Sequence, residues 1–158
     1  MGTPLSKAFT DEETAEPPPI VAARAPLPAG TPNYVTQRGL ALLREELAAL
    51  PAAHPQRRAQ LEERIASAVL VAPPAQPTDV VRFGATVTVE ADDGARRYRI
   101  VGVDEADPAN GRIAFTSPLA RALLGRRVGD VVRLRAPRGE LELEIRAVQH
   151  DREPLPAP

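Results

Sequence analysis

The spacing of apolar residues changes along the chain from a helical period to a strand period. Between Asn33 and Ala72 apolar residues recur at intervals of three and four, whereas beyond Val80 they alternate with polar residues. The first spacing is typical of amphipathic helices and the second of half-buried strands. A proline-rich stretch, residues 73–79, separates the two patterns. The sequence therefore predicts a helical region, a linker and a β-rich domain, in that order.

Two helices are predicted in the first region, and they should pair as an antiparallel hairpin. Thr36 suits the N-cap of the first helix, because its hydroxyl can accept a hydrogen bond from a free backbone N–H. The second helix is predicted from Gln56 to Leu70, and the prolines of residues 51–55 separate the two helices. The buried faces are expected to carry Leu40, Leu43, Leu47, Leu50, Leu61, Ile65, Ala68 and Val69.

The second region predicts a twisted, mostly antiparallel sheet of about five strands with one short helix. Asp92-Asp93-Gly94 is a strong turn signal between the first two strands. Ser117 can cap a short helix that begins at Pro118 and ends at Gly125, because glycine tolerates the left-handed conformation. The strands are expected at residues 83–91, 97–103, 112–115, 131–134 and 141–148. The predicted fold class is therefore α+β.

Composition favours one modest core with a tail at each end. The chain has 158 residues, of which 43% are hydrophobic, 3% are aromatic and 18 are proline. Residues 1–32 combine several prolines with the acidic run Asp11-Glu12-Glu13, and such a segment buries too little apolar surface to offset its ordering entropy. The expected organisation is a disordered Pro-rich tail at 1–32, a helical hairpin at 33–72, a linker at 73–79, a sheet domain at 80–150 and a tail at 151–158.

Charge and residue types exclude several classes of function. Without cysteine the chain can form no disulfide, thiolate metal site or cysteine nucleophile. Its formal net charge of -1 lacks the basic footprint of an independent nucleic-acid binder, so we expect no direct sequence-specific contact with nucleic acid. No apolar run approaches the roughly 20 residues that cross a bilayer, which favours a soluble, cytoplasmic protein. The residues predict no catalytic group, cofactor or metal site, and we expect no enzymatic activity.

Residues 113–130 carry the most specific pattern in the chain. A strand is followed by the Ser117-Pro118 cap, a short apolar helix, a glycine stop and a Gly-Asp turn. This pattern resembles the C-terminal domain of the GreA/GreB family of bacterial transcription elongation factors. Residues 36–47 are similar to the start of that family's first helix, and the resemblance extends over residues 33–150. It implies a short antiparallel coiled coil followed by an FKBP-like domain.

The resemblance also implies a partner and a surface. Members of the family dock their C-terminal domain on the rim of the secondary channel of bacterial RNA polymerase, while the coiled coil reaches toward the active centre. Carried over to this chain, the docking residues are Ser117, Pro118, Leu119 and Arg121. The same residues would also make an ordinary, well-capped connection between two strands, and this alternative stays open.

The turn between the two helices, Pro51 to Pro55, departs from the family pattern. Members that promote transcript cleavage carry acidic residues there, because carboxylate oxygens hold a Mg²⁺ ion and orient the attacking water. This turn has neither Asp nor Glu, and imidazole is a poor ligand for Mg²⁺, so His54 is a candidate tip contact only. Helices of about 14 residues also extend only about 21 Å. We therefore expect a non-catalytic regulator that modulates elongation or competes with other channel factors without stimulating transcript cleavage.

Two other functions are alternatives. The shortened coiled coil resembles Rnk, a Gre-related regulator of nucleoside diphosphate kinase, so the second hypothesis is an adaptor that binds this kinase or another protein. FKBP-like folds also include prolyl isomerases, but three Phe, two Tyr and no Trp are few for the aromatic pocket of such an enzyme.

The second helix carries a candidate basic patch, Arg57, Arg58 and Arg64. Such a patch could contact RNA or acidic residues of the polymerase. A solvated helix face is the favoured interpretation, because no aromatic residues are interleaved with these arginines to stack on bases.

Overall fold

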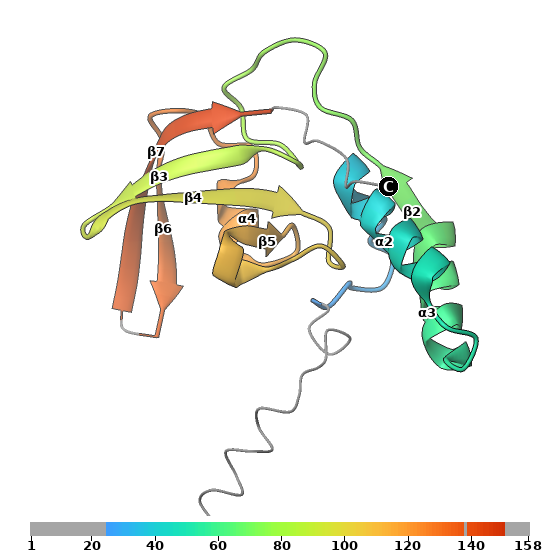
Figure 1. The fold of residues 1–158 in the computed structure, drawn as a ribbon. Helices are drawn as coiled ribbons and strands as arrows, with labels where there is room; N and C mark the ends of the chain where they lie inside the picture. Colours follow the sequence, from blue (N-terminus) through green and yellow to red (C-terminus); the bar gives the residue numbers. More distant parts are fainter. Residues whose placement is uncertain (1–24, 138, 151–158) are drawn as a thin grey trace, which may run out of the picture.

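The chain folds as a helical hairpin beside a curled, five-stranded sheet, seen in a computed structural model (Figure 1). The described residues are 25–137 and 139–150, so most of the expected tail at 1–32 and all of that at 151–158 lie outside them. The elements in chain order are β1 (Asn33–Val35), α2 (Gln37–Ala49), α3 (Pro55–Ser67), β2 (Ala68–Leu70), β3 (Thr86–Ala91), β4 (Gly94–Val101), η2 (Pro108–Asn110), β5 (Arg112–Ala114), α4 (Pro118–Leu123), β6 (Val131–Ala136) and β7 (Gly139–Gln149). This is the predicted α+β class. None of the described helices is both long and apolar enough to cross a membrane.

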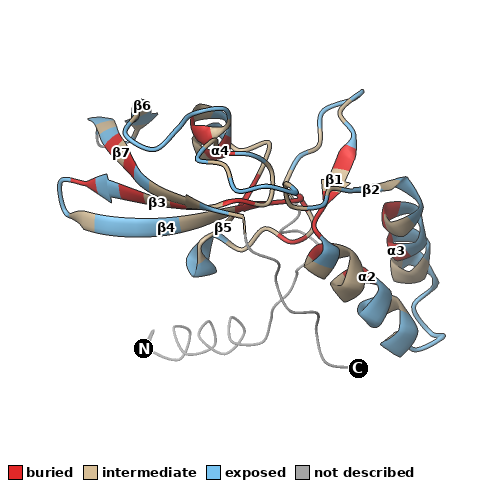
Figure 2. Cartoon of the chain, turned by 90° about the horizontal axis from the view of Figure 1, so that it is seen from above, coloured by how far each residue is buried: buried red, intermediate tan, exposed pale blue. Residues whose placement is uncertain are grey.

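Helices α2 and α3 form the predicted hairpin, and their starts follow from the sequence. The Gly39 N–H donates to Thr36 Oγ1 at 2.9 Å, which satisfies one of the free donors at the start of α2. Pro55 stands at the start of α3, where its missing N–H costs little. Leu43 and Leu61 are buried, whereas the outward faces of both helices are largely exposed (Figure 2). The hairpin is therefore amphipathic, as the leucine spacing predicts.

The second helix is shorter than predicted. It ends at Ser67, and the next three residues form β2, which pairs in parallel with β1 so that Val69 lies opposite Tyr34. The expected burial of Val69 is wrong, since this residue is 43% exposed. Residues 68–70 form a strand and not a last turn of helix, because β1 offers partners for their backbone groups. The Val71 N–H, for example, donates to the Val35 carbonyl oxygen at 3.0 Å. The base of the hairpin is thus closed by hydrogen bonds between its entering and leaving strands.

The sheet has the strand order β5-β4-β3-β7-β6. Its β4–β5 pair is parallel and the pairs β3–β4, β3–β7 and β6–β7 are antiparallel, which agrees with the predicted mostly antiparallel sheet. The β3–β4 turn falls at Asp92 and Asp93, and Ala91 pairs with Gly94. Gly94 has a φ of 127°, in the region that favours glycine. The turn signal in the sequence is therefore confirmed.

One face of the sheet and helix α4 enclose the core. Residues of β3 alternate, so that Val87 and Val89 are fully buried and Glu90 is exposed. Ala120 and Leu123 of α4 are fully buried as well. The buried cluster consists of Val81, Ala85, Val87, Val89, Ala91, Ile100, Ile113, Ala120, Leu123, Val132, Leu143 and Ile145. Helix α4 is therefore fixed to the sheet by its own inward-facing residues.

A buried polar cluster, which we call the junction, joins the hairpin to the sheet; it comprises Thr36, Arg38, Arg64, Asp104 and Glu105. The Glu105 side chain is 3% exposed and accepts hydrogen bonds from Thr36 Oγ1 at 2.6 Å and from Arg38 Nη1 at 3.0 Å. Arg64 Nη1 of α3 lies 3.3 Å from Asp104 Oδ1. Both helices are thus tied to the loop after β4, and these contacts set the direction of the hairpin relative to the sheet.

A close backbone contact accompanies the junction. A Cβ at Gly102 would lie 2.4 Å from the Tyr34 carbonyl oxygen, so the absence of a side chain lets β1 approach the loop after β4. Next to this contact the rings of Tyr34, Phe83 and Phe115 pack with centroids 5.4 to 6.0 Å apart. Tyr34 is therefore a contact residue between hairpin and sheet.

Candidate functional site

The predicted docking residues lie on residues 115–130, here called the α4 segment, whose start is capped as the sequence predicts. The Ala120 N–H donates to Ser117 Oγ at 3.3 Å, and Pro118 occupies the first position of α4. The Ser117 N–H donates to the Ala114 carbonyl oxygen at 2.9 Å. The entry into the helix is thus held by hydrogen bonds on both sides of Ser117.

The far end of the α4 segment is tied to the sheet domain. Gly125 has a φ of 84°, as expected for a glycine stop, and its N–H donates to the Val81 carbonyl oxygen at 2.8 Å. The Val81 N–H donates back to the Arg126 carbonyl oxygen at 2.8 Å. The Gly129 N–H donates to the Ile145 carbonyl oxygen at 2.8 Å. Because both ends are fixed, the α4 segment presents its outward side chains from a rigid support.

The four predicted docking residues differ in exposure. Pro118 and Arg121 are exposed, whereas Ser117 and Leu119 are half-buried and Leu119 packs against the core. Arg126, which sequence reasoning missed, is also exposed. Its position directly after the glycine stop, in a turn, is the signal that could have identified it. The exposed residues of the α4 segment therefore include a proline ring and three cations, Arg121, Arg126 and Arg127.

Two other exposed arginines of the sheet, Arg133 and Arg146, are paired with acids. Arg133 Nε lies 3.0 Å from Glu142, and Arg146 Nη2 lies 2.8 Å from Glu90. The hydrogen bond to Glu90 and the nearby charges of Glu144 and Glu90 raise the pKa of Arg146. Within residues 25–137 and 139–150, by contrast, no acidic side chain forms an ion pair with Arg121 or Arg126. Their charges are therefore available to a partner from outside the described residues.

The described part of the N-terminal segment lies beside the docking residues. Thr116 Oγ1 donates a hydrogen bond to the Pro26 carbonyl oxygen at 3.1 Å, across 90 residues of sequence. The segment makes a turn of its own, in which the Thr31 N–H donates to the Pro28 carbonyl oxygen at 3.0 Å. The end of the expected tail, residues 25–32, is therefore placed against the sheet domain, and sequence reasoning did not predict this.

The tip of the hairpin carries His54 in an exposed turn. His54 is the N-cap residue of α3, but its side chain makes no capping hydrogen bond. The nearest residues of the turn are proline and alanine, so no carboxylate stands there. Across the described ranges, no three His, Asp or Glu side chains gather in a way that could hold a metal ion.

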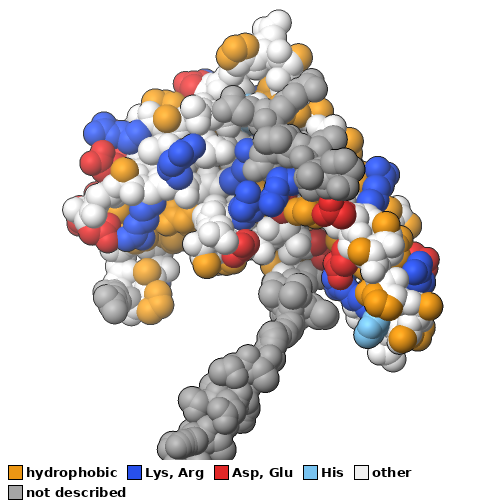
Figure 3. Space-filling view, in the orientation of Figure 1, with side chains coloured by type: hydrophobic (Ala, Val, Ile, Leu, Met, Phe, Trp, Pro, Cys, Tyr) orange, Lys and Arg blue, Asp and Glu red, His pale blue; other side chains and the backbone are white. Residues whose placement is uncertain are grey.

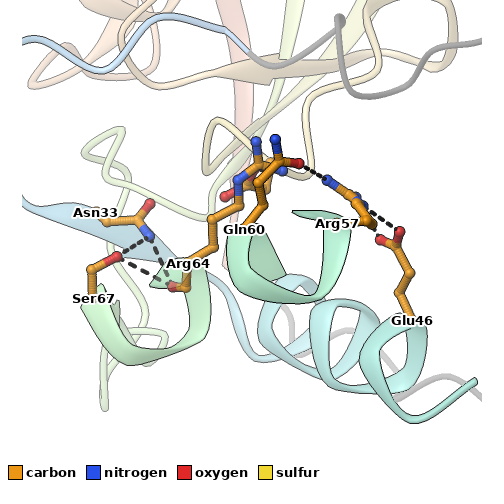
Figure 4. Close-up of polar contacts among 7 residues, drawn as sticks. Asn33, Glu46, Arg57, Gln60, Arg64 and Ser67 are labelled. Atoms are coloured by element: carbon orange, nitrogen blue, oxygen red, sulfur yellow. Dashed lines mark hydrogen bonds and ion pairs between the residues drawn. The ribbon is translucent and has the colours of Figure 1, made fainter. Parts of the chain in front are cut away.

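The three arginines of the candidate basic patch do not form one surface. Arg57 makes two hydrogen bonds of 2.7 Å to the Glu46 carboxylate (Figure 4). Arg58 lies 4.0 Å from Glu62. For Arg64, both interpretations of the sequence are wrong, the basic patch and the solvated helix face. This residue is only 9% exposed and faces Asp104 at the junction. The helix period could not reveal that this face meets an acid from the sheet domain. Figure 3 accordingly shows side chains of both signs over the hairpin.

Asn33 and Arg64 also help to hold the base of the hairpin. Asn33 Nδ2 donates to the Arg64 carbonyl oxygen at 3.2 Å and to Ser67 Oγ at 3.1 Å (Figure 4). A small cavity of about 120 Å³ lies between the hairpin and the loop after β4, and its charged lining includes Arg57, Arg64 and Glu105. Each of these charged groups forms an ion pair within the chain, so we assign them a structural role in holding the hairpin in place.

Comparison with known proteins gives a family for the sheet domain. Residues 76–150 match the family described as transcription elongation factor GreA/GreB, C-terminal domain. The transcription elongation factor GreA of Anaeromyxobacter sp. (strain K) is 50% identical over 102 residues, which cover 63% of this chain and 61% of that protein. GreA of Acidiphilium cryptum is 46% identical over 95 residues, which cover 59% of this chain and 60% of that protein. The chain thus spans about three fifths of the length of these relatives.

A solved structure also matches, over a longer stretch of the chain. The GreA/GreB elongation factor from Nitrosomonas europaea is 25% identical, and the match covers 73% of this chain and 95% of that chain with a TM-score of 0.43. The Rnk alternative receives no support from the two GreA relatives, which are named as elongation factors.

Proposed function

We propose that this chain, whose residues 76–150 match the C-terminal domain of the GreA/GreB family, is a non-catalytic factor that binds bacterial RNA polymerase at the rim of the secondary channel. In this role it modulates transcription elongation in the cytoplasm, or competes with other channel factors, without stimulating transcript cleavage. The observation that carries the proposal is the exposed pair Pro118 and Arg121 on the rigid α4 segment.

The physical argument for docking is preorganisation. Association costs less when the contact residues are already held in place, and the α4 segment is tied to the sheet at both ends. Arginine is enriched among residues that dominate binding energy, and an exposed cation also steers a partner of opposite charge. Helix α4 therefore offers a hydrophobic ring and a cation in a fixed geometry, which an acidic surface with a shallow apolar pocket would fit.

Replacing Pro118→Ala together with Arg121→Glu should weaken binding to purified core RNA polymerase at least about tenfold. Alanine is tolerated at the start of a helix and Arg121 has no described ion-pair partner, so the fold should persist. Fluorescence anisotropy with labelled protein measures the affinity. The matched control is Arg97→Glu, a charge reversal at an exposed position of β4. Equal affinity of the double variant and the natural sequence would contradict this surface assignment.

Transcript cleavage in stalled elongation complexes should stay at its intrinsic rate when the protein is added. The tip has no carboxylate for a metal ion, and 13 residues of helix extend only about 20 Å. The protein should instead reduce cleavage stimulated by a limiting amount of GreA, because the two would compete for one surface. Cleavage assays with labelled transcripts measure both effects. A clear increase in cleavage by the protein alone would disprove the non-stimulating role.

The variant Ala52→Asp, Ala53→Glu separates the two reasons for inactivity. If reach is inadequate, this acidic tip should remain inactive in the same assay. Stimulation by the variant would show that the missing carboxylates alone account for inactivity of the natural sequence.

A further inference from the structure

The described chain begins directly beside the proposed docking residues. Pro26 is held against Thr116 by the 3.1 Å hydrogen bond, and Thr116 immediately precedes Ser117. The first described residues, 25 and 26, therefore lie at the edge of the α4 segment. This placement is a property of the fold, since residues 26 and 116 are far apart in sequence.

The charges of the two elements are complementary. Residues 1–24 contain four acidic side chains, Asp11, Glu12, Glu13 and Glu16, against two basic ones, Lys7 and Arg24, which is a balance of -2. On the α4 segment, Arg121 and Arg126 are exposed and have no acidic partner among the described residues, whereas Arg127 is 3.0 Å from Asp79. Of the three arginines of the α4 segment, Arg121 and Arg126 are thus the two without a counter-charge among the described residues.

Chain length permits contact between the two. About ten residues separate Glu16 from Pro26, and an extended chain spans up to about 3.5 Å per residue, so the acidic run can reach any part of the α4 segment. A tether of this length also keeps the acidic residues at an effective concentration of the order of millimolar near the surface. Weak exposed ion pairs can therefore populate an intramolecular contact that the same peptide would not form when free.

We infer that residues 11–16 bind the Arg121 and Arg126 surface of the α4 segment within the same chain and compete with RNA polymerase for it. The inference rests on the proposed function for its consequence but not for the contact itself. The occupied surface lowers the apparent affinity for polymerase by the fraction of molecules in which it is free. The segment thereby acts as an internal competitor.

The contact is tested in the full chain without polymerase. Because the chain has no cysteine, Ala15→Cys gives a single site for a nitroxide spin label next to the acidic run. At low salt, the label should broaden the NMR amide signals of Leu119 to Arg121 and of Arg126. The signals should recover at about 1 M salt, where the Debye length is about 3 Å.

Charge reversal provides the specific control for this measurement. Arg121→Glu with Arg126→Glu should abolish the broadening, whereas Arg97→Glu should leave it unchanged. No broadening at low salt, or broadening that persists in the double variant, would overturn the inference whatever the polymerase experiments show.

The consequence is tested by neutralising the segment. Changing Asp11→Asn, Glu12→Gln, Glu13→Gln and Glu16→Gln in the full chain should strengthen binding to core polymerase by about three- to tenfold. Unchanged affinity, with the NMR contact present, would overturn the competition. Absence of polymerase binding by every variant would instead disprove the proposed function, and the spin-label result would still decide whether the contact exists.

Discussion

Replacing Glu105→Ala should destabilise the protein by about 3 kcal/mol, because it removes the buried acceptor on which the junction depends. The Glu105 side chain is 3% exposed and is bound by Thr36 Oγ1 and Arg38 Nη1. Its loss takes the acceptor from a buried hydroxyl and removes one partner of the Arg38 guanidinium, whose side chain is 27% exposed. Urea unfolding followed by circular dichroism measures the change in the free energy of unfolding.

The control for Glu105 is an exposed acid of the same sheet domain. Glu142 pairs with Arg133 at 3.0 Å, and both side chains are more than half exposed. Glu142→Ala should cost less than about 1 kcal/mol, as surface ion pairs do. A loss at Glu105 no larger than the loss at Glu142 would show that the junction contributes little. A double-mutant cycle with Arg38→Ala isolates the pairwise term.

Gly102→Ala should destabilise the protein by a similar amount, about 3 kcal/mol, for a steric reason. The added Cβ would lie 2.4 Å from the Tyr34 carbonyl oxygen, and a backbone atom cannot move away as a flexible side chain could. We expect β1 to separate from the loop after β4. The unfolding free energy and the amide hydrogen exchange of the β1–β2 pair both measure this effect.

Ala95→Val is the matched control for the added bulk. Ala95 is an exposed residue of β4, so the larger side chain should change stability by less than about 0.5 kcal/mol. Full stability and normal exchange in Gly102→Ala would show that the close approach of β1 is not required.

Local signals in the sequence predicted the parts of the fold that depend on near neighbours. The Thr36 and Ser117 caps, the Gly125 stop and the Asp92-Asp93 turn are each confirmed, because each needs only residues within a few positions. The predicted end of α3 was wrong, because residues 68–70 pair as a strand with β1. The strand partner of Ala68 is Asn33, which lies 35 residues earlier in the sequence. Helix periodicity contains no information on that pairing.

In the candidate site, too, local features were predictable from the sequence and contacts between distant residues were not. The capped helix under Ser117 and Pro118 was predictable, since the cap is local. The different exposures of Leu119 and Arg121 depend on how α4 packs on the core, and the contact of Thr116 with Pro26 spans 90 residues. Arg64 was misassigned for a related reason, because its acid partner comes from the loop after β4. Contacts of this kind follow from the tertiary arrangement and not from the local pattern.

Because β1 and β2 pair at the base of the hairpin, the length of the two helices can change without changing this base. The strands that enter and leave the hairpin are hydrogen-bonded to each other at its base, and the Glu105 contacts lie within the first turns of α2. Turns of helix added or removed beyond that base would change only the distance of the tip, by about 10 Å for every seven residues in each helix. Reach can therefore diverge between related chains while the base, the junction and the α4 segment stay the same.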